Sequence, residues 1–185
     1  MPDIIDRVWS FVVGEEGETL DLTHDDKGNW TGGEVGVGEL RGSKFGVSAK
    51  TYPTVDIAAL TRDGAKAIFV RDYWQKFSCD QMPAPLGLLV VDAAYNGGHP
   101  IQWLQLALGV ANDGVFGPAT KAAIAAQVPA GRAKEIATEM LAQRLAYLST
   151  GPLWSMFGAA DGKPKGWARR LMALPFEAMN LLATS

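Results

Sequence analysis

The sequence predicts a mainly α fold with a small β-rich lobe near its amino-terminal end. Apolar residues recur at helical spacing through much of the 185-residue chain, beginning with residues 3–14. Between Gly28 and Gly46 glycine is too dense for a helix interior, so this run fits a twisted β-hairpin or a wide loop. The length suffices for one well-buried core, and we expect a single domain over residues 1–185.

The first helix stops close to the side chain that most resembles a catalytic group. Gly14 and Gly17 predict the helix end, which places Glu16 there, half against apolar packing. Such packing raises the pKa of a carboxylic acid, because desolvation penalises the charged form. A glutamic acid that keeps its proton near neutral pH can serve as the general acid that expels a sugar oxygen.

Acidic and hydroxyl side chains follow Glu16 in the glycine-rich part of the chain. The spacing Glu16-x8-Asp25-x5-Thr31 is similar to that of phage-type lysozymes. A helix-end glutamate facing a β-rich lobe with Asp and Thr also resembles the lysozyme arrangement. This resemblance implies a lysozyme-like α+β fold with a helical core and a small β-hairpin lobe.

A longer stretch carries a more specific resemblance. Residues 14–53 read GEEGETLDLTHDDKGNWTGGEVGVGELRGSKFGVSAKTYP. They resemble the glycosyl hydrolase 108 family, bacterial and phage N-acetylmuramidases whose Glu-Gly-Gly motif carries the catalytic glutamate. The resemblance implies a catalytic role for Glu16, although Glu18 stands in place of the second motif glycine.

The resemblance leaves two of the catalytic positions open. Counting forward from Glu16 selects Asp25, whereas counting back from Gly28-Asn29-Trp30 selects Asp26. The threonine of the phage-type spacing is Thr31. The family's own threonine, which precedes an aromatic-Gly-Ile-Thr pattern, falls on Ser43. One aspartate would stabilise positive charge on the sugar ring or position a water molecule, and one hydroxyl would hold that water.

The carboxyl-terminal half carries a second pattern. Residues 94–124 read AYNGGHPIQWLQLALGVANDGVFGPATKAAI and resemble the peptidoglycan-binding-type segment that accompanies this family. We therefore expect residues 1–85 to hold the catalytic glutamate and the β-rich lobe. Residues 86–185 should form the helical lobe of the same domain.

Several polar or aromatic residues in the expected helices are candidates for substrate binding. Tyr73 and Trp74 could stack on sugar rings, with core packing as the alternative. Tyr95 and Asn96 are polar exceptions in an otherwise apolar helix, and Asn96 is either a substrate ligand or a helix C-cap.

A long amphipathic helix is expected between Gly131 and Thr150, with Leu145 among its inward residues. We expect Arg144 to pair with a buried carboxylate. Arg170, in the terminal helix, is expected on a solvated face.

Composition excludes several classes of function. A net charge of −3 gives no basic field for nucleic acid. Cys79 is the single cysteine, so no internal disulfide is expected, and neither histidine has neighbours at metal-ligand spacing. We expect no cofactor, no metal, no signal peptide and no membrane span.

The sequence thus favours a monomeric endolysin made in the host cytoplasm that acts on peptidoglycan glycan strands after release by a holin. Its expected reaction is hydrolysis of the β-1,4 bond between N-acetylmuramic acid and N-acetylglucosamine. A lytic transglycosylase acting on the same bond is an alternative. Another is a non-catalytic wall-binding or secretion-activating module, in which Glu16 is only a helix-end charge.

Overall fold

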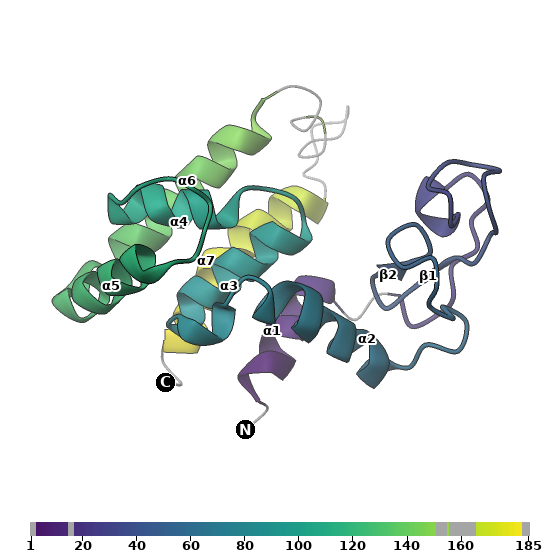
Figure 1. The fold of residues 1–185 in the computed structure, drawn as a ribbon, viewed down its shortest axis with the longest axis horizontal. Helices are drawn as coiled ribbons and strands as arrows, with labels where there is room; N and C mark the ends of the chain where they lie inside the picture. Colours follow the sequence, from purple (N-terminus) through teal and green to yellow (C-terminus); the bar gives the residue numbers. More distant parts are fainter. Residues whose placement is uncertain (1–2, 15–16, 151–154, 156–165, 183–185) are drawn as a thin grey trace. The chain divides into compact units, whose positions relative to one another are not determined.

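The computed structural model describes residues 3–14, 17–150, 155 and 166–182. The chain divides into two compact units, Met1–Asp72 and Tyr73–Ser185, which we call unit one and unit two (Figure 1). Helices dominate the described residues, and a two-stranded antiparallel hairpin lies in unit one. The predicted mainly α fold with a small β-hairpin lobe is confirmed, whereas the single domain with parts meeting at residues 85 and 86 stays a prediction.

Unit one begins with α1 (Ile4–Val13), the amphipathic helix expected over residues 3–14. Its buried residues are Val8, Trp9 and Val12. The helix ends at Gly14, whose φ of 80° suits glycine, and the Gly14 N–H donates to Ser10 O at 3.0 Å. The predicted helix end near Gly14 is confirmed.

The glycine-rich run is mostly wide loop and ends in the hairpin. Strands β1 (Ser43–Lys44) and β2 (Val47–Ser48) pair with Ser43 opposite Ser48. Phe45 and Gly46 join them with φ of 51° and 75°, the positive values that two-residue hairpin turns favour. The hairpin is therefore shorter than the glycine-rich stretch that predicted it.

A second helix closes unit one. α2 (Arg62–Phe69) begins after Thr61, whose hydroxyl accepts a hydrogen bond from the Gly64 N–H at 3.1 Å. After Phe69 the chain widens into η2 (Val70–Gln75), a π-helical segment that runs into unit two.

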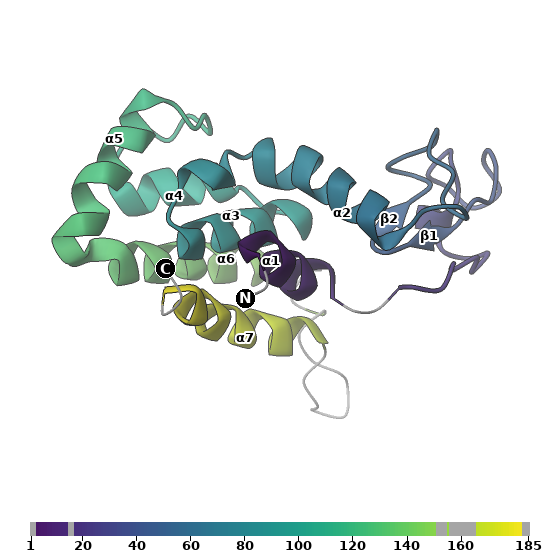
Figure 2. The same cartoon turned by 90° about the horizontal axis from the view of Figure 1, so that it is seen from below.

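The described residues of unit two form five α-helices, and α3 contacts three of the others (Figure 2). Their bounds are α3 (Ala84–Tyr95), α4 (Pro100–Leu108), α5 (Pro118–Gln127), α6 (Ala133–Leu148) and α7 (Gly166–Leu182). α3 contacts α4, α6 and α7, and its residues from Pro85 to Ala93 are buried. Its burial agrees with the otherwise apolar helix expected around Tyr95 and Asn96. None of the described helices has the length and hydropathy needed to cross a membrane.

A buried ion cluster joins three of these helices. Asp92 of α3 pairs through its two carboxylate oxygens with Arg144 of α6 and Arg170 of α7. The predicted pairing of Arg144 with a buried carboxylate is confirmed. The prediction of a solvated Arg170 is wrong, because the packing of α7 on α3 leaves its side chain only 24% exposed.

The inward face of α6 also differs from the prediction. Its buried residues follow a spacing of four: Ile136, Met140, Arg144 and Leu148. Leu145 is 42% exposed, so its expected inward position is wrong. Arg144 is buried in place of the expected Leu145. Its charge is tolerated there because the carboxylate of Asp92 pairs with it.

Gln105 organises the loop between α4 and α5. This buried side chain donates to Asp113 Oδ1 (2.6 Å), Val115 O (2.9 Å) and Thr120 Oγ1 (3.2 Å). Its carbonyl accepts from the Gly114 N–H at 2.8 Å. The Val115 N–H and then the Gln105 amide hold the pKa of Asp113 below its ordinary value. The Gln105 side chain therefore holds the Asp113-Gly114 turn in place.

Replacing Gln105 by alanine is expected to lower the free energy of unfolding by about 1–3 kcal/mol, because buried groups of the loop lose their partner. Urea unfolding followed by circular dichroism measures this. Gln143→Ala is the control, since the Gln143 side chain donates to the exposed Glu139 of its own helix, at 2.7 Å. Equal losses in the two variants would contradict the structural role of Gln105.

The only cysteine of the chain opens η3 (Cys79–Gln81) and is fully buried. A Cβ atom added to Gly87 would lie 3.0 Å from Cys79 O and 3.1 Å from the ring of Trp74. Glycine at this position therefore allows α3 to approach the Cys79 segment closely. Burial is the main cause of the raised pKa of the Cys79 thiol.

Candidate functional site

The predicted general acid, Glu16, lies outside the described residues, between Gly14 and Gly17. Both glycines have positive φ, 80° and 94°. The Gly17 carbonyl accepts a hydrogen bond from the Phe45 N–H at 2.7 Å. The chain that follows Glu16 is therefore tied to the hairpin turn of unit one.

The two candidate aspartates lie in an exposed turn of unit one. The Asp25 side chain is 95% exposed, and its Oδ1 is 3.2 Å from His24 Nδ1. Asp26 is the N-cap of the 3-10 turn η1 (Lys27–Asn29), accepting from the Gly28 N–H at 2.8 Å. The Asp26 carboxylate therefore has a local structural partner, while that of Asp25 is almost fully hydrated.

The two candidate hydroxyls occupy different parts of the loop. Thr31 Oγ1 accepts from the Glu39 N–H at 2.9 Å, which fixes the side chain across the wide loop. Ser43 lies in β1 and exchanges two backbone hydrogen bonds with Asp21, of 2.9 and 3.0 Å. This bridge places Ser43 beside the segment that leaves residue 17.

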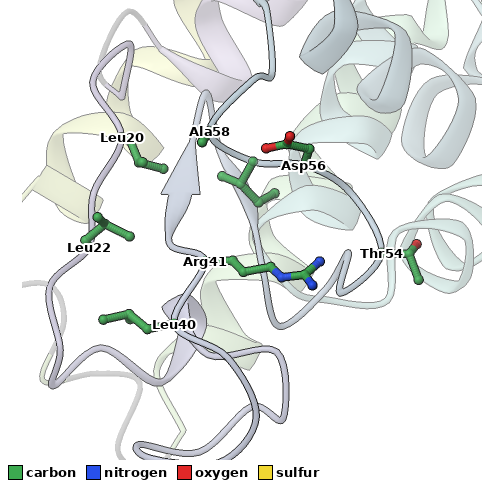
Figure 3. Close-up of a pocket in the computed structure, with 8 residues that line it drawn as sticks. Leu20, Leu22, Leu40, Arg41, Thr54, Asp56 and Ala58 are labelled. Carbon is green, nitrogen blue, oxygen red and sulfur yellow. The ribbon is translucent and has the colours of Figure 1, made fainter.

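A pocket of about 500 Å³ is lined in part by the two neighbours of Asp21, the residue that forms this bridge (Figure 3). Its lining residues are Leu20, Leu22, Leu40, Arg41, Thr54, Asp56, Ile57 and Ala58. Leu20 and Leu22 flank Asp21 in the extended segment, so their side chains project to one side and that of Asp21 to the other. The pocket therefore has an apolar side made by a single short stretch of chain.

Figure 3 shows the polar side chains across the pocket from these leucines. Asp56 Oδ1 accepts from the Ala59 N–H at 3.1 Å. The Arg41 guanidinium donates from Nε to Glu39 Oε2 at 2.6 Å and from Nη1 to Pro53 O at 3.1 Å. Both polar groups are therefore held in place by their own neighbours in unit one.

Buried Asn29 positions the segment that carries Arg41. The backbone carbonyl of Asn29 accepts from the backbone N–H groups of Arg41 and Gly42, both at 3.0 Å, and the side-chain Nδ2 donates to Thr23 O at 3.0 Å. Asn29 is fully buried, so these bonds are shielded from water. The loop around the pocket is thus braced by an interior amide rather than by long strands.

The absence of a side chain at Gly42 makes room for the leucines on the apolar side of the pocket. A Cβ atom there would lie 2.4 Å from Asp21 O and 2.9 Å from Leu22 Cδ2, and its φ is 82°. We expect Gly42→Ala to lower the stability of unit one by more than the roughly 1–3 kcal/mol of backbone strain alone. Urea unfolding measures the loss.

Gly36→Ala is the matched control. Gly36 has a similar φ of 79°, but nothing lies within 4 Å of an added Cβ. The strain is thus shared by the two variants and the clash is not. Equal losses would show that the close approach at Gly42 has no energetic effect.

Comparisons with known proteins decide the family. The glycosyl hydrolase 108 model matches residues 9–98, a range that includes Glu16 and every residue lining this pocket. Residues 9–98 belong to the glycosyl hydrolase 108 family. The chain is also similar to the structure of Brucella abortus SagA, with 25% sequence identity and a TM-score of 0.69 over 96% of this chain and 94% of that one. No curated protein matches the chain.

The glycosyl hydrolase 108 match indicates a glycoside hydrolase and supports a peptidoglycan-hydrolase type of function in general. The structural similarity agrees with the predicted lysozyme-like fold. The family match ends at residue 98, so the likeness of residues 94–124 to a peptidoglycan-binding segment stays a prediction.

The predicted substrate-binding residues lie in unit two. The rings of Tyr73 and Tyr95 pack 4.9 Å apart, and burial raises the pKa of Tyr95 to about 12. Trp74 is 5% exposed, which agrees with its core-packing alternative. Asn96 is the C-cap of α3, and its Nδ2 donates to Asp92 O at 3.0 Å. The structure therefore brings Tyr73 and Tyr95 together, and gives Trp74 and Asn96 structural contacts.

The sequence prediction missed the pocket residues Leu20, Leu22, Arg41 and Asp56. The Leu-Asp-Leu alternation of residues 20–22 was the available signal, since alternation over an extended segment sends two apolar side chains to one side. Arg41 and Asp56 had no such signal. Arg41 is held near the segment that carries Asp56 by its hydrogen bond to Pro53 O, a contact that no local pattern specifies.

Proposed function

We propose that this protein hydrolyses the β-1,4 bond between N-acetylmuramic acid and N-acetylglucosamine in peptidoglycan, with Glu16 as the general acid. The family match over residues 9–98 carries the proposal, because it spans both Glu16 and the pocket of unit one. The pocket lining begins four residues after Glu16, at Leu20.

The proposed chemistry needs one proton donor and one water molecule. Glu16 gives its proton to the glycosidic oxygen as the bond from C1 to that oxygen breaks. Water then adds to C1 and loses a proton to a base. Asp25 or Asp26 stabilises the positive charge on the ring or positions the water, with Thr31 or Ser43 holding it.

The hydrated carboxylate of Asp25 supports its assignment over Asp26. Asp26 Oδ1 already accepts the Gly28 N–H as an N-cap, whereas the contact of Asp25 is to the exposed His24 ring. Between the hydroxyls, Ser43 has the support of its backbone bridge to residue 21, which brings it beside the chain that follows Glu16. Replacing each of these aspartates and hydroxyl residues by alanine, one at a time, tests both assignments.

The product of digestion tests the reaction. Purified sacculi are incubated with the protein, reduced with borohydride and analysed by mass spectrometry. Hydrolysis at the proposed bond yields reduced N-acetylmuramic acid ends. A 1,6-anhydro product would instead show a lytic transglycosylase, and reduced N-acetylglucosamine ends would place the cut at the other glycosidic bond. Binding to sacculi without new ends would favour a wall-binding module.

Access to the wall is a separate part of the proposal. We propose that the protein is made in the cytoplasm and reaches peptidoglycan after release by a holin. Expression alone and with a holin tests this, since lysis should require both.

A further inference from the structure

The unit-one pocket combines an apolar wall with one donor and one acceptor, and we propose that it binds the acetamido group of an N-acetylhexosamine in the glycan strand. In this assignment Asp56 accepts from the amide N–H and Arg41 donates to the amide carbonyl, while the methyl group contacts the leucines. The inference rests on the proposed function, because it names what the same enzyme recognises in its substrate.

The apolar wall supplies a surface for the methyl group. Leu22 is 47% exposed and Leu20 and Leu40 are half-buried, while Ile57, which also lines the pocket, is 1% exposed. An exposed leucine on a monomer needs no explanation alone, but three that line one hollow form a binding surface. The methyl group of an acetamide is small and apolar enough to be buried there.

Asp56 retains acceptor capacity toward the pocket. Oδ1 accepts from the Ala59 N–H, and within the described part of the chain Oδ2 has no hydrogen-bond partner. The Asp56 carboxylate is therefore fixed by its own turn and can still accept a substrate N–H.

Arg41 is similarly positioned in advance. Nε and Nη2 both contact Glu39 Oε2, at 2.6 and 2.5 Å, and Nη1 donates to Pro53 O. A guanidinium group has five N–H donors, so these three contacts leave two available. Because Glu39 and Pro53 hold the group, a ligand does not have to order it.

The charges of the pocket distinguish an amide from an ion. One guanidinium and one carboxylate line the same hollow, and Glu39 already pairs with Arg41. A carboxylate of the peptide stems would be attracted by Arg41 but repelled by Asp56, and an ammonium group would meet the reverse, so neither ion suits both residues. A neutral amide, which has one donor and one acceptor, satisfies both residues.

The size of the pocket fits this ligand together with its ring. A hollow of about 500 Å³ exceeds the needs of an acetamido group and lies within the range of ligand sites. The sugar ring that carries the acetamide would therefore enter with it.

The test compares native sacculi with sacculi whose glycan has been enzymatically de-N-acetylated, using wild-type protein and single variants. Release of reducing ends gives KM and kcat, and sedimentation gives binding. We expect wild-type protein to lose roughly tenfold or more in kcat/KM on the deacetylated wall. Asp56→Ala and Arg41→Gln should raise KM to a similar extent on native wall, and should show little further loss on deacetylated wall.

Conservative and remote variants separate recognition from folding. Asp56→Asn keeps an oxygen for the Ala59 N–H but presents an NH2 donor in place of the acceptor Oδ2, so it should preserve the turn and raise KM nearly as much as Asp56→Ala. Asp63→Asn is the exposed control for Asp56. Arg132→Gln is the control for Arg41, because Arg132 also pairs with a glutamate through Nε, at 2.9 Å to Glu135 Oε2. Both controls should match wild type.

Two outcomes distinguish failure of the inference from failure of the proposed function. If wild-type protein cuts both walls equally well, or both pocket variants retain wild-type KM, the acetamide assignment is wrong and the hydrolase proposal stands. If no reducing ends appear from native wall, the hydrolase proposal fails. Sedimentation then still decides the pocket, since equal binding to the two walls overturns the assignment.

Discussion

Glu16→Gln is expected to reduce the release of reducing ends from peptidoglycan by about 100- to 10,000-fold, the range in which general acid catalysis contributes. Glutamine has nearly the same shape as glutamic acid but cannot give a proton to the glycosidic oxygen. The fold should be retained, because only the ionisable group changes. Circular dichroism and the clearing of permeabilised Gram-negative cells measure the two effects.

Glu15→Gln is the matched control, since it removes the same charge at the neighbouring position. We expect it to keep activity close to wild type. Wild-type clearing by Glu16→Gln would overturn the assignment of the general acid. A large loss in Glu15→Gln with full activity in Glu16→Gln would move the role by one residue.

The largest effect on stability is expected at Asp92. In Asp92→Ala the Arg144 guanidinium, whose side chain is 3% exposed, keeps its charge in the core without the carboxylate that faces it. Breaking a buried pair by removing one partner costs about 3–5 kcal/mol. Urea unfolding of the full chain, followed by circular dichroism, should show this loss in unit two.

An exposed ion pair of the same unit provides the comparison. Glu135→Ala breaks the pair between Arg132 and Glu135, whose side chains are 47% and 70% exposed. Exposed pairs contribute about 0–1 kcal/mol, so this variant should unfold almost as wild type does. If Asp92→Ala were as mild, the ion cluster would not be what joins α3, α6 and α7.

Helix positions followed from local patterns in the sequence, and side-chain partners did so only in part. Apolar spacing predicted α1, and the glycines at positions 14 and 17 predicted where it ends. The prediction for Arg144 was correct because burying a cation among apolar residues requires an anion. The prediction for Arg170 was wrong, because its partner Asp92 lies 78 positions earlier and no local pattern connects the two residues.

The candidate site was harder to predict because loops bring distant residues together. Glycine density between Gly28 and Gly46 indicated a turn-rich lobe, but the hairpin spans only Ser43–Lys44 and Val47–Ser48. Most of the lobe is fixed by single backbone contacts and by the buried amide of Asn29. Such contacts leave no periodic trace, so the grouping of Arg41 with Asp56 became visible only in three dimensions.

The solitary cysteine makes the protein its own reporter of local opening. In the native state Cys79 is buried, and burial disfavours the reactive thiolate form. A maleimide or disulfide reagent should therefore label Cys79 only when the η3 segment moves away from α3. The labelling rate against urea concentration would then give the opening free energy at one known position. No engineered probe is needed, because the chain has no second thiol to compete.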